Sequence, residues 1–491
     1  MSVDTNNAAF QDALNLIQYT RQSVFLTGKA GTGKSTFLRY VCENTKKKHV
    51  VLAPTGIAAI NAGGSTMHSF FKLPFYPLLP DDPNLSLQRG RIHEFFKYTK
   101  PHRKLLEQIE LVIIDEISMV RADIIDAIDR ILRVYSHNLR EPFGGKQLLL
   151  VGDVFQLEPV VKNDEREILN RFYPTPYFFS ARVFGQIDLV SIELQKVYRQ
   201  TDPVFVGVLD HIRNNTAGAA DLQLLNTRYG SQIEESEADM YITLATRRDT
   251  VDSINEKKLA ELPGDPITFE GVIEGDFPES SLPTSQELVL KPGAQIIFIK
   301  NDFDRRWVNG TIGVIAGIDE EEETIYVITD DGKECDVKRE SWRNIRYRYN
   351  EKTKEIEEEV LGSFTQYPIR LAWAITVHKS QGLTFSRVVI DFTGGVFAGG
   401  QAYVALSRCT SLDGIQLKKP INRADVFVRP EIVNFAGRFN DRQAIDKALK
   451  QAQADVQYAA ASRAFDKGDM EECLEQFFRA IHSRYDIEKS V

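Results

Sequence analysis

The fold class is decided by the stretch SVFLTGKAGTGKS, which runs from Ser23 to Ser35. Its first five residues form an apolar run that predicts a buried strand, and the eight residues from Gly28 match the phosphate-binding pattern G-x4-G-K-S. The segment Lys34–Glu43 that follows has the apolar spacing of a helix. Strand, glycine loop and helix in this order predict a P-loop, in which backbone N–H groups and the helix start hold phosphate oxygens. A glycine-rich turn that binds no nucleotide is the weaker alternative.

Apolar runs of the same kind recur on both sides of helical patterns, which predicts parallel sheets with right-handed crossovers. The runs are nearly continuous, as expected of strands that are covered on both faces. In the first third of the chain they are His49–Ala53, Leu111–Asp115 and Gln147–Val151. A second alternating region begins near Leu189, and its candidate strands are Val190–Leu194, Tyr241–Ala245, Gln295–Ile299 and Arg370–Thr376.

Two segments have a different texture. Residues 301–363 carry short alternating runs with Gly and Asp-Gly turns, which predict a small β-barrel inserted into the second α/β domain. Residues 437–491 have helical spacing with Gly468 at a turn, which is similar to one tetratricopeptide-type helix pair. Because a solenoid needs about three such pairs, we predict a helical hairpin that packs on the body of the protein. The expected organisation is therefore a first α/β domain over 1–187, a second over 188–300 plus 364–436, and these two additions. A proline-rich insert at about 64–83 is interpreted either as a wedge or as a packed surface loop.

The composition is that of a globular protein, with 43% hydrophobic and 26% charged residues. The net charge is −9, which argues against a chain that only coats nucleic acid or anionic membrane, although a local basic groove is compatible with it. The four cysteines form no CxxC pair, so we expect neither a zinc site nor a disulfide framework. No signal peptide or membrane span is evident, which predicts an intracellular protein, cytoplasmic and associated with the nucleoid if it is bacterial.

Several polar residues follow the predicted strands and suit ATP hydrolysis. Lys34 can reach the β- and γ-phosphates, and Ser35 can bind Mg²⁺. The strand LVII ends in Asp115 and Glu116, where the first carboxylate would complete the Mg²⁺ shell and the second would activate water. Gln156 follows the strand LLLV and has the chemistry to hold the γ-phosphate or its water, although a surface Gln is the alternative for this segment alone.

Together these segments resemble those of superfamily-one helicases, in which two RecA-like domains enclose ATP. The motifs in chain order are GKAGTGKS, APTGIAA, TMHSF, IIDEISM, VGDVFQLEPV, VYRQ, AWAITVHKSQGLTF and YVALSRCTSLDGI. Their order and spacing are similar to those of the RecD/Pif subgroup. The segment REPFGGKQLLLVGD resembles the signature of the Pif helicases, so the chain resembles a compact, helicase-core member of that family. The resemblance implies that the two parallel-sheet domains are RecA-like.

The resemblance also implies roles for individual residues. The catalytic set would be Lys34, Glu116, Gln156, Arg199 and Arg408, with the two arginines supplied in cis as arginine fingers. The nucleotide-binding set would be Gln11, Gly28, Gly31, Thr32, Gly33, Lys34, Ser35, Thr36, Gln381 and Gly382, and Mg²⁺ would bind Ser35 and Asp115. Gln11 would read the adenine, with a Gln on a helix surface as the alternative. The nucleic-acid contacts would be Pro54, Thr55, Gly56, His68, Phe70, His378 and Lys379.

The function that we predict is an ATP- and Mg²⁺-dependent DNA helicase, and its 5′→3′ direction on single strands is implied by the resemblance to the Pif helicases. Its expected substrates are single-stranded DNA and tailed duplexes, with G-quadruplexes and RNA–DNA hybrids as further substrates, and it would be a monomer when free. Two alternatives stay open. One is a RecD-like motor subunit that needs a partner, and the other is an ATP-gated nucleic-acid clamp that does not travel. RNA as the main substrate is a further alternative, because backbone contacts discriminate weakly.

Overall fold

The computed structural model places the P-loop at the end of an interior strand, next to one edge of a six-stranded parallel sheet that is here called the first sheet. The structure describes residues 4, 7–87, 91–198, 200, 202–230 and 240–485. The strand order is β3-β2-β4-β5-β1-β6. The strands are β1 (Val24–Gly28), β2 (His49–Ala53), β3 (Ser65–Thr66), β4 (Leu111–Ile114), β5 (Gln147–Val151) and β6 (Val190–Leu194). The predicted strand and helix around the P-loop are confirmed.

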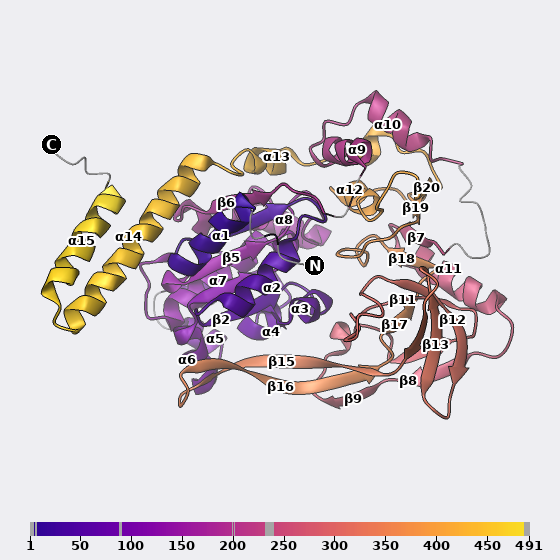
Figure 1. Ribbon diagram of the computed structural model, residues 1–491, viewed down its shortest axis with the longest axis horizontal. Coiled ribbons are helices and arrows are strands. Elements are labelled where there is room, and N and C mark those ends of the chain that lie inside the picture. Colours follow the sequence, from indigo (N-terminus) through magenta and orange to yellow (C-terminus); the bar gives the residue numbers. More distant parts are fainter. Residues whose placement is uncertain are drawn as a thin grey trace.

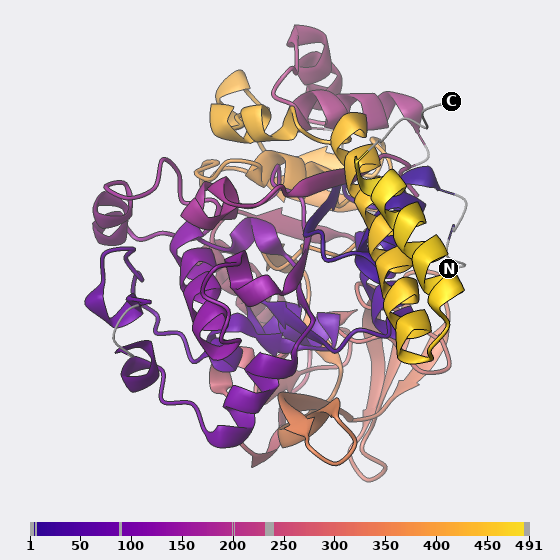
Figure 2. The same cartoon turned by 90° about the vertical axis from the view of Figure 1, so that its left-hand side faces the viewer.

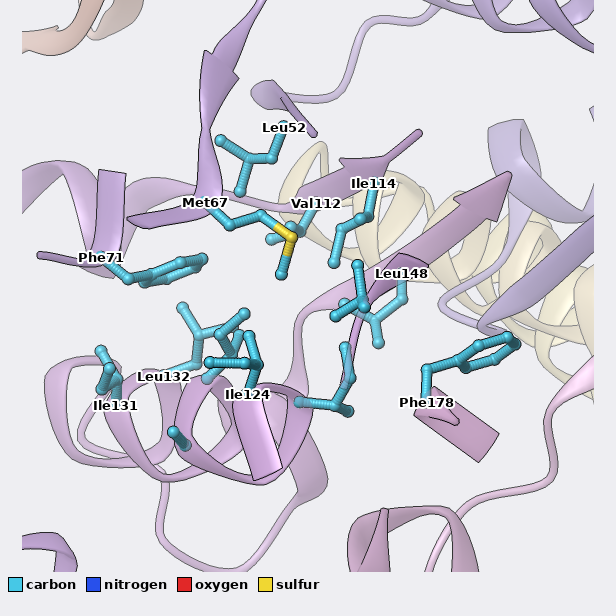
Figure 3. Close-up of a cluster of buried hydrophobic side chains, with 14 of the residues drawn as sticks. Leu52, Met67, Phe71, Val112, Ile114, Ile124, Ile131, Leu132, Leu148 and Phe178 are labelled. Atoms are coloured by element: carbon cyan, nitrogen blue, oxygen red, sulfur yellow. The ribbon is translucent and has the colours of Figure 1, made fainter. Parts of the chain in front are cut away.

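Helices cover both faces of the first sheet, which explains its continuous apolar strands. Alternate residues of β4 face opposite layers: Val112 and Ile114 belong to one core, and Leu111 and Ile113 to the other. Figure 3 shows the first of these cores, where the side chains of the strands meet those of helix α7. The helices around this sheet are α1 (Ala8–Tyr19), α2 (Lys34–Asn44), α3 (Gly56–Ala62), α4 (Met67–Phe71), α5 (Arg91–Phe95), α6 (Lys100–Gln108), α7 (Ala122–Tyr135) and α8 (Asn163–Leu169).

Strand β6 corrects the expected boundary between residues 187 and 188. We expected Val190–Leu194 to open the second domain, but it pairs in parallel with β1 over its whole length, from Val24↔Val190 to Gly28↔Leu194. Its side chains Val190, Ile192 and Leu194 pack into the core that α1 and α2 cover. An apolar run that is buried on both faces looks the same whichever parallel sheet it joins, so its composition could not assign it.

The second sheet is also parallel, and its four strands follow the order β18-β7-β19-β20. They are β7 (Ile242–Ala245), β18 (Ala374–Thr376), β19 (Val388–Asp391) and β20 (Ile415–Leu417). Its helices are α9 (Pro203–Arg213), α10 (Ala219–Asn226), α11 (Arg248–Glu261) and α12 (Gln401–Leu406). The two parallel sheets lie side by side, with α9 and α12 near the first sheet (Figure 1). The predicted mixed α/β class with two parallel sheets is therefore present.

The antiparallel part is larger than the expected barrel at 301–363. Its strands form three sheets, in the orders β14-β13-β12-β11-β17, β15-β16-β9 and β10-β8. They are β8 (Ile267–Glu270), β9 (Val272–Gly275), β10 (Glu287–Leu290), β11 (Gln295–Phe298), β12 (Ile312–Asp319), β13 (Thr324–Thr329), β14 (Glu334–Val337), β15 (Glu340–Asn350), β16 (Glu355–Gln366) and β17 (Ile369–Leu371). Because β11 pairs antiparallel with β12 and β17, the run at Gln295 does not join the second sheet as we expected.

The hairpin of β15 and β16 extends from this antiparallel part along the first sheet's layer (Figure 1). Alternate residues of β15, including Ile345, Tyr347 and Tyr349, join the core beneath the first sheet. The backbone N–H of Val51 donates a hydrogen bond of 3.3 Å to the Tyr347 hydroxyl. The hairpin therefore ties the antiparallel part to the first sheet by apolar burial.

The C-terminal region is helical, as expected. It contains α13 (Pro430–Ala436), α14 (Arg442–Asp466) and α15 (Met470–Tyr485). Figure 2 shows α14 and α15 as an antiparallel pair along the side of the molecule. The start of α14 packs on the first sheet's layer, where Ile445 and Ala448 are buried against α1 and β6. Among the described residues, no helix has the length and apolar character needed to cross a membrane.

Candidate nucleotide and nucleic-acid sites

The P-loop has the backbone geometry that its glycines allow. Gly33 has φ +90°, and it lies directly before the first residue of α2, so the loop turns sharply into the helix. A Cβ atom at Gly28 would lie 2.6 Å from the Leu194 carbonyl oxygen, so only glycine fits between β1 and β6 there. The Lys34 ammonium donates hydrogen bonds of 2.7 and 3.0 Å to the carbonyls of Gly28 and Lys29, at the mouth of the loop.

The two acids at the end of β4 lie beside the P-loop. Glu116 adopts a left-handed backbone conformation (φ +50°, ψ +42°), and its N–H donates to the Asp115 carboxylate at 2.9 Å. Burial and the neighbouring Asp115 raise the pKa of Glu116 to about 7. Burial also raises the pKa of Asp115, against the opposing pull of Lys34. A carboxylate with a pKa near neutrality is suited to accept a proton from water.

A cavity of about 1000 Å³ opens beside these residues, and both sheets line it. The first sheet contributes the P-loop, the β4 acids and two residues after β5, namely Gly31, Thr32, Gly33, Lys34, Ser35, Thr36, Asp115, Glu116, Gly152 and Gln156. The second sheet contributes Gly382, Thr384 and Arg408. The structure therefore brings most of the predicted nucleotide-binding and catalytic residues around one cavity.

The second sheet makes direct polar contacts across this cavity. Arg408 is 1% exposed, and its guanidinium donates to the carbonyls of Val404, Ser380 and Leu383, which hold it at the cavity wall. The Gln381 amide donates to the Gln156 amide oxygen at 3.4 Å, so these two predicted residues meet although they come from different sheets.

The P-loop itself also contacts α9 and α12, two helices of the second sheet. The backbone N–H of Ala30 donates to the Tyr403 hydroxyl at 3.1 Å, and Tyr403 lies on α12, close to Arg408 in sequence. Lys29 forms an ion pair of 2.5 Å with Asp210 of α9. Sequence reasoning missed both contacts, because only the fold brings these helices to the P-loop.

One end of the cavity differs from the prediction for adenine binding. Asp4, Asn7, Phe10 and Tyr198 line it, whereas Gln11, the residue after Phe10 on α1, does not. The Tyr198 hydroxyl donates to the Asp4 carboxylate at 2.8 Å, which places an aromatic ring at the cavity edge. The arginine that follows Tyr198 was predicted to be a finger, and Arg199 lies outside the described residues.

The predicted nucleic-acid residues on the first sheet are partly covered. Thr55 is exposed and caps α3, where its hydroxyl accepts from the Ala58 N–H at 3.2 Å. Pro54 is half-buried beside it. Gly56 faces the antiparallel part so closely that a Cβ there would meet the Ser281 hydroxyl at 2.5 Å. Ser281 therefore covers part of the surface at Gly56, while Thr55 beside it is exposed.

The aromatic residues near the insert require one correction. Phe70 was predicted to stack on a base, but it is 4% exposed and packs edge-on against Phe71, so it belongs to the core. Phe75 nearby is 84% exposed and stacks on His68 with ring centroids 4.9 Å apart. Burial lowers the pKa of His68, with Arg121 adding to the effect, which favours its neutral form.

The insert at 64–83 has buried residues on both sides of an exposed tip. Leu73 and Leu78 are buried, and the Leu78 N–H donates to the buried Asp123 carboxylate at 2.9 Å. Between them, Phe75 and Tyr76 are exposed. The loop is thus anchored at both ends while its aromatic tip faces solvent.

On the second sheet, His378 is half-buried and Lys379 is exposed, in the loop after β18. Burial lowers the pKa of both side chains, and for Lys379 the cations Arg370 and Arg248 lower it further. A phosphate would relieve this repulsion between cations. The structure thus places both predicted residues in one loop of the second sheet.

Two parallel sheets that enclose a P-loop cavity, with an arginine supplied across it, define a P-loop motor ATPase. A family description, PIF1-like helicase, matches residues 4–211. The ATP-dependent DNA helicase Pif1 of Campylobacter jejuni is 33% identical in an alignment 412 positions long that covers 80% of this chain and 88% of that protein. The chain therefore belongs to the PIF1-like helicases and is a helicase ATPase.

Solved structures agree with this assignment. The structure of Bacteroides sp Pif1 in complex with ADP-AlF4 is similar with a TM-score of 0.80 and 42% identity, over 88% of this chain and 96% of that one. Bacteroides Pif1 bound to ssDNA is similar with a TM-score of 0.63 and 41% identity, over 90% of this chain and 99% of that one. The arrangement of this chain is thus more similar to the ADP-AlF4 complex than to the ssDNA complex.

The residues at the P-loop fit a magnesium ion. Mg²⁺ prefers hard oxygen ligands and is usually bound by one or two protein groups together with substrate phosphates and water. The Ser35 hydroxyl and the Asp115 carboxylate line the cavity on the side of Lys34 and offer oxygens of this kind. Among the described residues, no cluster of three or more His, Cys, Asp or Glu side chains is arranged to hold a metal ion.

Proposed function

We propose that this chain moves 5′→3′ along single-stranded DNA and unwinds the duplex ahead of it, driven by ATP hydrolysis in the cavity between the two sheets. The observation that carries the proposal is that both sheets line this cavity, with Arg408 in the wall from the second sheet and the Gln381–Gln156 hydrogen bond joining the two sides. Binding and hydrolysis of ATP then change how the sheets meet, which is what a motor needs. The direction is supported by the resemblance of the ordered motifs to those of the Pif helicases.

In the proposed chemistry, each residue at the cavity has one task. Lys34 and the loop glycines Gly31 and Gly33 bind the phosphates, and Ser35 with Asp115 would hold Mg²⁺, which supplies charge neutralisation on the phosphate oxygens. Glu116 accepts the proton of the attacking water, which Gln156 orients.

Arg408 neutralises the charge that develops on the transferred phosphoryl group. Gln381 and Gly382 contact the γ-phosphate from the second sheet. The corresponding proposal for Arg199 rests on the sequence alone. Tyr198 stacks on the base, so we propose it in place of Gln11 as the main base contact.

The proposed path of the DNA crosses both sheets. Thr55 and Gly56 hold phosphates on the first sheet, and His378 with Lys379 hold them on the second. The exposed Phe75 at the tip of the insert is the aromatic placed to stack on a base or to split the duplex. A relative, Bacteroides Pif1, has been solved bound to ssDNA, which supports a single strand as the ligand here.

Three further properties belong to the proposal. G-quadruplexes and RNA–DNA hybrids are unwound as well, because stacking and phosphate contacts do not read sequence. The chain is a monomer when it is free of DNA. It acts inside the cell, where reduced cysteines such as Cys42 and Cys409 persist.

The experiment compares matched duplexes that carry either a 5′ or a 3′ single-stranded tail, with ATP and Mg²⁺ and with the variant Lys34→Ala as control. We expect opening of the 5′-tailed duplex alone, and none by the variant. Opening of the 3′-tailed duplex alone would keep the motor and refute the direction. Hydrolysis without opening of either duplex would refute unwinding by the isolated chain and favour the clamp or the partner-dependent motor.

A further inference from the structure

The carboxylate of Asp153 lies behind Gln156 and contacts three groups that belong to two sheets. Asp153 is 1% exposed and follows β5. Arg213 of α9 donates to its two oxygens at 3.1 and 3.4 Å. The Phe155 N–H donates at 3.2 Å, and the Gln156 side-chain amide nitrogen donates at 3.5 Å. A single buried carboxylate thus joins α9 to the loop that presents Gln156.

The orientation of the Gln156 amide follows from this contact. An amide has a donor end and an acceptor end, and the donor end of Gln156 faces Asp153. The oxygen end is therefore turned the other way, where it accepts from Gln381 and faces the cavity. Holding an attacking water requires an acceptor at this place, so a reversed amide would present the wrong group.

The charge of Asp153 is itself held in place by Arg213. Arg213 is 3% exposed, lies 2.9 Å from the Glu193 carboxylate of β6, and stacks on the Phe155 ring at 4.3 Å. Burial alone would lower the pKa of Arg213, but Asp153, Tyr403 and Glu193 raise it, so the guanidinium stays charged. A paired arginine of this kind fixes its carboxylate partner in one geometry through two parallel contacts.

We propose that Asp153 and Arg213 are positioning residues of the ATPase, which act through Gln156 by fixing the orientation of its amide. Because Arg213 comes from the helix α9 and Asp153 from the first sheet, the orientation is correct only when the two parts are docked. This inference rests on the proposed role of Gln156. It assigns to the pair an effect on turnover and none on nucleotide affinity.

The test uses the isosteric variant Asp153→Asn in the full chain. The guanidinium of Arg213 would take the amide oxygen of the new side chain, which leaves an NH₂ group facing the Gln156 nitrogen and turns the Gln156 amide around. We expect kcat for ATP to fall at least tenfold, with KM and the affinity for a fluorescent ADP unchanged within about twofold. Arg213→Lys keeps the charge but loses the two-point contact. We expect it to lower kcat by a smaller factor, again with KM and ADP affinity unchanged.

The decisive measurement places Asp153→Asn in a Gln156→Ala background. If Asp153 acts through Gln156, Asp153→Asn lowers kcat less than twofold in the Gln156→Ala background. Arg228→Lys is the matched control, because Arg228 contacts Asp413 and the Ile415 carbonyl within the second part and away from the cavity. A melting temperature within a few degrees of the parent establishes that each variant is folded.

The outcomes separate this inference from the proposed function. If Gln156→Ala is slow and Asp153→Asn still lowers its kcat tenfold, the inference is overturned and the proposed function stands. Full activity of Gln156→Ala would overturn the proposed role of Gln156 and this inference with it. A raised KM with unchanged kcat in Asp153→Asn would also overturn the inference, because it would assign Asp153 to binding.

Discussion

The two parallel sheets contribute to the cavity in different ways. In the first sheet, β1, β4 and β5 end at the cavity, so the P-loop, Asp115 and Gly152 are delivered by strand ends. In the second sheet, the cavity residues Gly382 and Arg408 come from a loop and from the residues after α12. The first sheet therefore carries the P-loop and both acids, whereas the groups of the second sheet line the cavity only because the two sheets are docked. Binding should follow from the first sheet alone, and hydrolysis should require both.

The largest effect is expected for Arg408→Ala, which removes the charge supplied by the second sheet. An arginine in this role contributes about 10³-fold or more to phosphoryl transfer, so kcat should fall by about that factor. The affinity for a fluorescent ADP should stay within a few-fold, because the phosphate site belongs to the first sheet. Arg408→Lys serves as a second variant, since Arg408 also binds buried carbonyls. Loss of ADP affinity in step with kcat would contradict the division of tasks.

The next effect concerns Glu116, and it should appear both in kcat and in the pH dependence of kcat/KM. Removing the general base in Glu116→Gln should lower kcat by about a hundredfold. In the parent, kcat/KM should rise with pH through about 7 and fall about tenfold per pH unit below that, because the pKa of Glu116 is raised to about 7. A flat pH profile would exclude Glu116 as the base.

The same raised pKa makes Glu116 costly for folding. Its folded pKa lies above its ordinary value of 4.5, so its contribution to stability is present below pH 4.5 and is lost as the pH rises through about 7. Glu116→Gln should therefore be more stable than the parent by about 1–3 kcal/mol at pH 8, and not at pH 4. Denaturant unfolding at the two pH values measures this difference.

A smaller effect is expected away from the cavity, where the β15–β16 hairpin packs on the first sheet. Tyr347 on the β15–β16 hairpin is 6% exposed, and its hydroxyl accepts a hydrogen bond from the Val51 N–H. Tyr347→Ala should lower the free energy of unfolding by about 3 kcal/mol, since it leaves a cavity beside the first sheet. Tyr326→Ala is the matched control, because Tyr326 on β13 is 43% exposed and should change stability by less than about 1 kcal/mol. Equal losses would show that the hairpin is not held at Tyr347.

The smallest effect is expected at the base end of the cavity. Gln11→Ala should change the KM for ATP by less than about twofold, because Gln11 does not line the cavity. Tyr198→Ala should raise it by about tenfold, the size of one lost stacking contact. A larger effect of Gln11 than of Tyr198 would restore the original sequence prediction for the adenine.

The contrast between the sheets also explains what the sequence could predict. The places of Lys34 and Ser35 could be predicted because strand, turn and helix bring them together over a short stretch of sequence. Asp115 could be predicted because β4, β5 and β1 are parallel, so these strands end at the same edge of the sheet. The run at Val190 carries no signal for its partner, because β6 would be equally apolar in either sheet. Phe70 lies on a short helix where one position separates the core from the surface.

Contacts between distant parts of the chain could not be predicted from the sequence, because local patterns do not show which elements pack together. The bonds of Tyr403 to Ala30 and of Arg213 to Asp153 each join residues from elements that are distant in sequence. Nothing in the local spacing indicates them. The β15–β16 hairpin was foreseen as turns and strands, but its docking on the first sheet depends on the whole fold.

The most direct test of the bipartite site is a double-mutant cycle on kcat between Gln156→Ala in the first sheet and Arg408→Ala from the second. Both residues act on the same transferred group from opposite walls, so their losses should not add. We predict that the double variant is slower than Arg408→Ala by less than about threefold. Multiplication of the two single losses would show that the residues act independently, and would contradict a catalytic site built jointly by the two sheets.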